Sequence, residues 1–236
     1  CKGSVRGKYL LTGTLGYFLV TYLFYMTMGM YNVFYLGYVS LLGLSFFAFY
    51  LVMASFDIDS LSEIFKVSAP RRFAGGFLIF CAACIAFLWL GIIIPPLIDG
   101  SIVPIQVEHY TTLIVQGFDL SLLHPIAFVS GFLFLRKKRY GYLLAPVYLV
   151  FLSILMTALT AKIIAMDILG YNVIPVIFII PVFNLTAIIG TILTLKGIKE
   201  NTDFSFSASF ETEPEFEPKG YMGMELEKEA IKITDD

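Results

Sequence analysis

Six long stretches of mostly apolar residues dominate this sequence. Each holds about 20 residues or more, the length that an α-helix needs to cross a lipid bilayer. The apolar residues run continuously instead of alternating, so the pattern predicts helices and not the strands of a membrane barrel. The predicted spans are Tyr9–Gly29, Tyr31–Ser55, Phe73–Ile94, Thr111–Leu135, Tyr140–Ile164 and Tyr171–Leu195.

The composition supports the same fold class. Hydrophobic residues make up 58% of the 236 residues and charged residues only 14%, whereas a soluble domain carries about 25% charged residues. A soluble chain of this length needs a polar surface that so few charges cannot supply. We therefore predict an all-α fold, a polytopic transmembrane helical bundle with six spans in a lipid bilayer.

The positions of lysine and arginine predict the orientation of this bundle. If the six helices alternate in direction, 15 of the 16 cations lie on one side, and Lys162 is the exception. Because cytoplasmic segments of membrane proteins are enriched in Lys and Arg, both termini are predicted to be cytoplasmic. The 15 cations are Lys2, Arg6, Lys8, Lys66, Arg71, Arg72, Arg136, Lys137, Lys138, Arg139, Lys196, Lys199, Lys219, Lys228 and Lys232.

The composition changes sharply after Lys199. Residues 200–236 hold 11 acidic residues and 3 lysines, a net charge of −8, while residues 1–199 hold 13 cations and 7 acidic residues, a net charge of +6. Glutamates interleaved with prolines predict a disordered, solvated segment. We expect a six-helix transmembrane domain over 1–199 and an acidic, disordered cytoplasmic tail over 200–236. The tail either solvates the protein or binds a protein partner.

Two of the links between spans carry local structure signals. In the link Phe56–Arg72, Ser60 and Glu63 have capping-box spacing and are followed by apolar residues, which predicts a short helix lying on the membrane surface. The link Pro95–Tyr110 contains three prolines, which predicts an ordered loop and not a helix.

The fourth span contains the strongest candidates for a functional site, Gln116, Asp119 and His124. Polar side chains inside a bilayer cost several kcal/mol and therefore point to function. At about 100° per residue, Gln116 and Asp119 share a face, while His124 lies about 140° from Asp119, or less if Pro125 distorts the helix. One interpretation is a proton or cation site. The alternative is that the helix starts later and Asp119 is its N-cap at the membrane interface.

Asn184 in the sixth span extends this candidate site. It lies near the middle of the span and follows Pro175 and Pro181, which favour a kink or a local break with unpaired carbonyl groups. Because its depth is similar to that of the polar residues in the fourth span, we include Asn184 among the candidate solute-binding residues.

Several other chemistries are excluded or disfavoured. The chain has two histidines and no H-E-x-x-H, Walker A or dinucleotide-binding motif, so we predict no metal, no cofactor and no catalytic residue. Its slightly negative net charge gives no indication of nucleic-acid binding. Cys81 and Cys84 have the spacing of a redox pair, but their position in mid-span favours simple packing because a thiolate is disfavoured away from water.

Four short motifs resemble a pattern found in uncharacterised bacterial polytopic membrane proteins. They are Pro70-Arg71-Arg72, Trp89-Leu90-Gly91 followed by Pro95, Phe118-Asp119-Leu120, and the run from Leu135 to Pro146. The resemblance covers most of the predicted transmembrane domain and not the tail. It implies a location in the bacterial plasma membrane and a role for Asp119, and it supplies no activity.

These observations lead to three hypotheses on function. The first is a non-enzymatic membrane protein that moves or senses a small solute, ion or proton through Asp119, His124, Gln116 and Asn184. The second is a membrane-embedded enzyme that acts on a lipid or lipid-linked substrate, with Asp119 and His124 as acid and base and with Arg71 and Arg72 holding a phosphate. The third is a scaffold or regulatory subunit that works through the acidic tail.

Overall fold

The computed structural model describes residues 4–101, 104, 107 and 110–199. Within them six helical segments are long and apolar enough to cross a membrane, with α5, η2 and α6 forming one segment. This confirms the predicted number of spans; the predicted tail, 200–236, lies outside the described residues. The elements are α1 (Val5–Met28), α2 (Tyr35–Ala54), α3 (Leu61–Ile64), α4 (Arg71–Asp99), α5 (Ile114–Phe118), the π-helical turn η2 (Asp119–Leu123), α6 (His124–Leu135), α7 (Arg139–Ile168) and α8 (Val176–Lys196).

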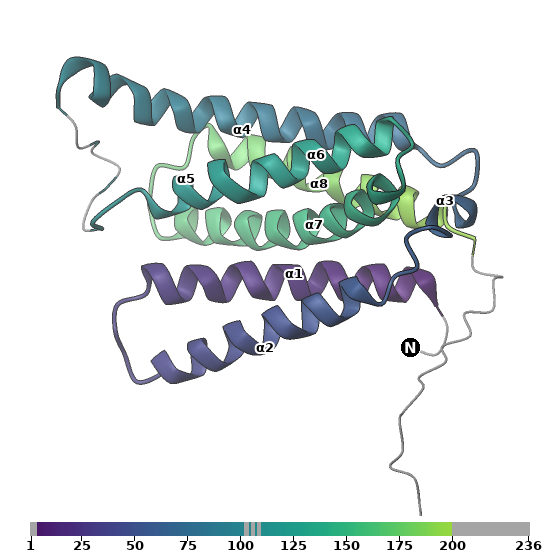
Figure 1. The fold of residues 1–236 in the computed structure, drawn as a ribbon. Coiled ribbons are helices and arrows are strands. Elements are labelled where there is room, and N and C mark those ends of the chain that lie inside the picture. The colour runs from purple at the N-terminus through teal and green to yellow at the C-terminus, as the bar shows by residue number, and fades with distance from the viewer. Residues whose placement is uncertain (1–3, 102–103, 105–106, 108–109, 200–236) are drawn as a thin grey trace, which may run out of the picture. The chain divides into compact units, whose positions relative to one another are not determined.

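Helix α7 forms the centre of the bundle. It packs against α1, α6 and α8 (Figure 1), and most of its residues from Gly141 to Leu152 are buried. Helix α2 is the contrast, because Ser45 is its one buried residue and its main neighbour is α1. In a bilayer most of the α2 surface therefore faces lipid, which accounts for its almost uniformly apolar sequence.

Helices α4 and α6 approach each other through two glycines. A Cβ atom added to Gly75 would lie 2.8 Å from the carbonyl oxygen of Gly131, and one added to Gly131 would lie 2.5 Å from that of Gly75. Small residues allow such backbone contact between membrane helices. The close approach fixes α4 beside the fourth span, where the candidate site lies.

The described cations, except Lys162, gather at one end of the bundle, which we call the basic end. Backbone hydrogen bonds at this end join segments that are far apart in the sequence. The Lys66 amide donates to the Gly197 carbonyl at 2.8 Å, and the Lys199 amide donates to the Ile64 carbonyl at 2.7 Å. The Arg6 guanidinium also donates to the Ile198 carbonyl. The described cations at this end, Arg6, Lys8, Lys66, Arg71, Arg72, Arg136, Lys137, Lys138, Arg139, Lys196 and Lys199, confirm the predicted clustering.

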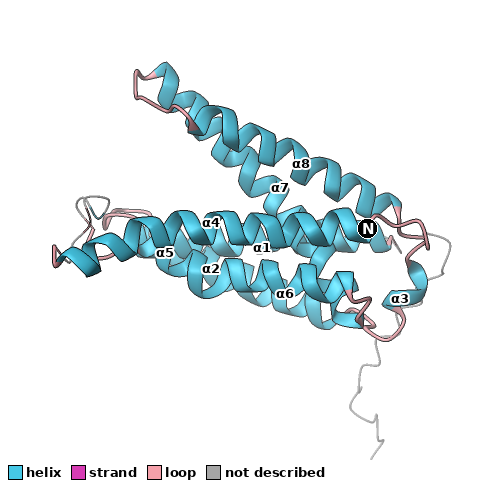
Figure 2. Ribbon diagram, turned by 90° about the horizontal axis from the view of Figure 1, so that it is seen from above, coloured by secondary structure: helices cyan, strands magenta, loops and turns pink. Residues whose placement is uncertain are grey.

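The short helix predicted in the first link exists, but its predicted place is wrong. Figures 1 and 2 place α3 at the basic end, where Leu61 is 1% exposed and Phe65 packs against the rings of Tyr9, Phe134 and Tyr142. The apolar side of α3 therefore contacts the protein core and not the membrane. The expected cap is also missing, because the Ser60 hydroxyl donates to the Asp57 carbonyl instead.

The predicted loop between the third and fourth spans begins later than expected. Helix α4 continues through Pro95 and Pro96 and ends at Asp99. Proline fixes φ near the helical value, although it removes the donors for the carbonyls of Gly91 and Ile92 and its ring crowds those carbonyls. The helix nevertheless continues past both prolines, and the loop prediction is wrong for its first five residues.

Candidate functional site

Asp119 lies inside the fourth span and not at its start. The helical segment begins at Ile114, and the backbone of Asp119 is helical, with φ −60° and ψ −53°. The N-cap alternative does not describe this helix, because a capping residue has an extended backbone and precedes the first turn. At about 1.5 Å per residue, Asp119 lies about 8 Å and His124 about 15 Å along the span from Ile114.

A π-helical turn brings Asp119 and His124 together. The His124 amide donates to the carbonyl of Asp119, five residues earlier, instead of four. The next residue, Pro125, has no amide hydrogen, so the Ser121 carbonyl lacks its α-helical donor. The wider turn places both side chains on one face, with His124 Nε2 3.8 Å from Asp119 Oδ2. The separation of about 140° predicted for a regular α-helix is wrong here, and the contact agrees with the alternative that Pro125 distorts the helix.

Two aromatic side chains from other helices surround this turn. Trp89 of α4 donates a hydrogen bond from Nε1 to Asp119 Oδ2 at 2.8 Å. Tyr148 of α7 donates from its hydroxyl to the Leu123 carbonyl at 2.9 Å. Neither residue was among the sequence candidates. Trp89 could have been found, because it is the single tryptophan of the chain and lies in one of the quoted motifs.

The Asp119 and His124 side chains are mostly buried, 16% and 12% exposed respectively. His124 Nε2 is buried and has no hydrogen-bond partner among the described residues. A carboxyl and an imidazole this close titrate as a pair. With one proton between them the pair is neutral overall, and gain or loss of a proton changes the charge of the site by one. The arrangement can therefore hold and release a proton inside the span.

The structure does not bring all four predicted site residues together. Gln116 lies one turn before Asp119, and its backbone carbonyl accepts from the Asp119 amide. Asn184 of α8 has a different partner, since its Oδ1 accepts from Thr157 Oγ1 at 3.1 Å. It forms part of a polar seam between α7 and α8 that also contains a hydroxyl pair, Ser153 and Thr191, 2.8 Å apart. Only Asp119 and His124 share one contact region.

The two mid-span cysteines are free thiols in α4. Cys81 is buried and Cys84 is half-buried. Among the described residues no group of three or more His, Cys, Asp or Glu side chains is placed to hold a metal ion.

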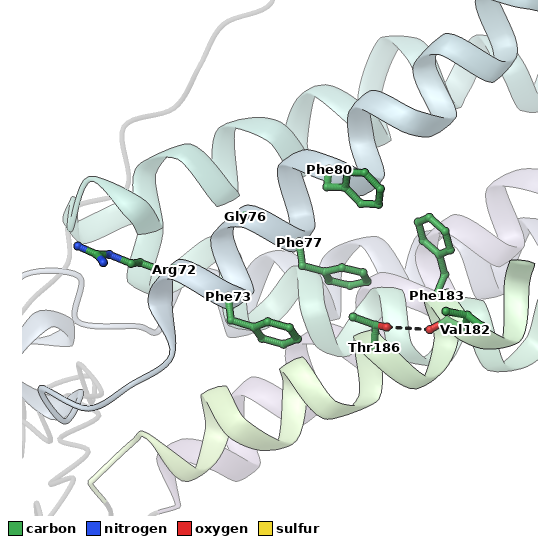
Figure 3. Close-up of a pocket in the computed structure, with 8 residues that line it drawn as sticks. All are labelled: Arg72, Phe73, Gly76, Phe77, Phe80, Val182, Phe183 and Thr186. Carbon is green, nitrogen blue, oxygen red and sulfur yellow. Dashed lines mark hydrogen bonds between the residues drawn. The ribbon is translucent and has the colours of Figure 1, made fainter.

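Two cavities lie elsewhere in the bundle. One, of about 150 Å³, has an apolar lining from α1, α2, η2, α6 and α7 that includes Phe49, Leu123 and the ring of Tyr148. The other, of about 400 Å³, lies between α4 and α8 (Figure 3). Neither of these two cavities is lined by Asp119 or His124.

Comparison with known proteins finds similarity in one part of the chain. The family model described as bacterial trigger factor protein matches residues 180–236, which are 57 of the 236 residues. Trigger factor from Syntrophus aciditrophicus (strain SB) is 51% identical over 41 residues, which is 17% of this chain and 9% of that protein. No solved structure matches the chain. The match thus covers less than a tenth of the length of this curated relative, and the similarity is limited to one segment of each protein.

Proposed function

We propose that this chain is an integral protein of the bacterial plasma membrane that moves or senses a proton or small cation through Asp119 and His124. One observation carries the proposal: a carboxyl and an imidazole lie 3.8 Å apart within a membrane-spanning segment, both mostly buried. Ionisable side chains are rare at such positions because their burial in a bilayer is costly, and they mark ion or proton pathways. Gln116, one turn away, extends the polar face toward the end of the span.

The surroundings of the pair support a proton as its ligand. Trp89 donates one hydrogen bond to Asp119, which fixes the carboxyl and leaves its other oxygen for a proton or a water molecule. His124 keeps a buried nitrogen, Nε2, that accepts or donates no hydrogen bond within the described residues. Asp119 and His124 lie on one turn, and the carboxyl is held in place by the Trp89 hydrogen bond. This arrangement suits repeated proton uptake and release at the second carboxyl oxygen and at the imidazole nitrogen.

The orientation of the bundle is part of the proposal. Since the described cations other than Lys162 gather at one end, the positive-inside rule places that end, and with it both termini, in the cytoplasm. Asp119 then lies in the outer half of the membrane, and His124 lies near the middle. A proton that enters from outside would meet Asp119 first.

The test is proton flux into vesicles that hold the purified protein and a trapped pH-sensitive dye. A potassium gradient with valinomycin supplies the driving voltage. We expect the wild type to acidify the interior faster than empty vesicles and Asp119→Asn to be no faster than empty vesicles. The matched control is Asp99→Asn, which removes an exposed carboxyl at the end of α4 and should leave the flux unchanged.

A protein that senses protons without moving them needs a second measurement. Trp89 is the only tryptophan and is bonded to Asp119, so its fluorescence reports on the pair. We expect the emission to change with pH in the wild type and not in Asp119→Asn. If flux and emission are both the same in Asp119→Asn as in the wild type, at equal incorporation, the proposal is wrong.

A second candidate function is the binding of a protein partner through residues 200–236. A tail that only solvates needs a composition and not a particular order of residues, whereas the match of the family model to residues 180–236, which include the whole tail, is a similarity in the order of residues. The test compares the full chain with a version in which 200–236 are shuffled at constant composition. Cross-linked partners should be lost on shuffling, and their retention would favour the solvating role.

A further inference from the structure

The groove between α4 and α8 combines an aromatic floor with one charged residue. Figure 3 shows Phe73, Phe77 and Phe80 of α4 directed toward α8, from which Phe183 faces them. Phe80 and Phe183 stack with ring centroids 6.0 Å apart, and Phe73 and Phe77 stack at 6.4 Å. The rings form a continuous apolar strip along the groove.

The wall of the groove offers no free polar group along this strip. Its single hydroxyl, that of Thr186, donates to the Val182 carbonyl of its own helix at 2.8 Å. Phe80 is 58% exposed and Val182 is 63% exposed, so the strip is open to a ligand from the lipid side. Such a groove suits a hydrocarbon chain.

Arg72 stands at the mouth of the groove. It is exposed, and within the described residues no ion pair or hydrogen bond joins its side chain to another group. Figure 3 shows its guanidinium directed away from the rings, beyond the start of the groove. Because α4 begins at Arg71, Arg72 lies where the span leaves the hydrocarbon. A guanidinium at that depth matches a phosphate group, which it can bind through two parallel hydrogen bonds.

We propose that this groove binds one anionic phospholipid, with its phosphate on Arg72 and an acyl chain along Phe73, Phe77 and Phe80. The dimensions agree, since Phe80 lies eight residues after Arg72 and therefore about 12 Å along the helix at ~1.5 Å per residue, close to the ~15 Å depth of one leaflet. The charges agree as well, because the other cations of the basic end add a positive potential that favours an anionic headgroup over a neutral one. The site is separate from Asp119 and His124.

The test uses vesicles of equal parts phosphatidylglycerol and phosphatidylcholine, followed by mild detergent extraction and native mass spectrometry. Arg72→Gln removes the phosphate partner. Gly76→Leu fills the groove, since Gly76 lines it and a Cβ added there meets nothing within 4 Å. Two variants are matched controls: Lys137→Asn removes a charge from the same end at a positive-φ position, and Gly91→Leu adds the same bulk to α4 in open space.

The expected results distinguish binding of the acyl chain in the groove from binding of the headgroup at Arg72. The wild type and both controls should retain one phosphatidylglycerol in preference to phosphatidylcholine. Arg72→Gln should retain lipid with a preference about fivefold lower, the effect of one cation near a membrane surface, and Gly76→Leu should retain no lipid while melting at the same temperature as Gly91→Leu.

Three outcomes would overturn the proposal. Equal lipid retention in Gly76→Leu and the wild type would mean that the groove is not the site. Displacement of the bound lipid by inorganic phosphate would show that the headgroup alone is held. A lipid-free dimer of the wild type would show that a second copy of the chain covers the groove.

Discussion

The two ends of the bundle are built differently. At the basic end, Tyr9, Phe65 and Ile198 are buried, and backbone hydrogen bonds join segments more than 130 residues apart. The opposite end contains the connections from α1 to α2, from α4 to α5 and from α7 to α8. There the side chains are open, and Met30 is 80% exposed and Val33 93% exposed. The described connections there are held by local bonds, such as that from the Phe34 amide to the Asn32 side chain.

This difference indicates which end of the bundle is more restrained by packing and hydrogen bonds. Tight packing and long-range hydrogen bonds at the basic end hold the helices in one arrangement. The π-turn with Asp119 lies in the half toward the opposite end, where fewer such contacts restrain it. A site that must open to protons or water is better placed there, and the lipid groove proposed above starts at the rigid end.

The largest effect should come from two glycines, one at each end. A Cβ added to Gly141 would lie 2.3 Å from the backbone carbon of Leu133 and the amide nitrogen of Phe134, whereas one added to Gly117 meets nothing within 4 Å. Backbone atoms cannot move aside as a flexible side chain does. We expect Gly141→Ala to destabilise the fold by about 3 kcal/mol or more and Gly117→Ala to stabilise it by up to ~1 kcal/mol.

Unfolding in a denaturing detergent, followed by circular dichroism, measures both variants. If Gly141→Ala is too unstable to purify, the amount of this variant found in membranes is compared with that of Gly117→Ala under the same conditions. Equal stability of the two variants would mean that the ends do not differ as described.

The next effect concerns a hydroxyl group at the basic end. Tyr9 donates from its buried hydroxyl to the Tyr142 carbonyl at 2.8 Å, and the α-helical donor for that carbonyl would be residue 146, which is a proline. Tyr9→Phe leaves the carbonyl buried without a donor, so we expect a loss of about 1–3 kcal/mol. Tyr25→Phe near the opposite end, where the ring is 51% exposed, should change stability by less than ~0.5 kcal/mol. The same unfolding assay compares them, and a smaller loss for Tyr9→Phe would weaken the contrast.

The sequence predicts the parts of this fold that depend on the bilayer alone. The apolar runs identify all six spans because their length is set by membrane thickness, and the cations identify the basic end. The burial of Leu61 and Phe65 against the core could not be predicted, because it depends on contacts between segments that are far apart in the sequence.

Two of the four residues predicted for the candidate site, Asp119 and His124, lie together in the structure, and their geometry could not be predicted. Asp119 and His124 stand out because polar groups are rare in such spans. Their contact depends on the π-turn, which a regular 100° helical wheel cannot show. Asn184 has a suitable depth, but depth gives no information on rotation about the helix axis, and its hydroxyl partner on α7 lies elsewhere in the bundle.

The smallest effect is expected from converting the π-turn into a regular α-helix. The half of the bundle that contains the turn is less restrained and should allow this conversion. Pro125→Ala supplies an amide donor for the Ser121 carbonyl, so we expect a regular α-helix that rotates His124 by about 100° away from Asp119. The coupling between the two side chains should then fall from about 1 kcal/mol to nearly zero. Nitrogen-15 NMR of the two histidines measures it, because Asp119→Asn should shift the titration midpoint of His124 in the wild type and not in Pro125→Ala. An equal shift in the wild type and in Pro125→Ala would mean that the surrounding helices, and not the proline, maintain the π-turn. The half that contains the turn would then be as rigid as the basic end.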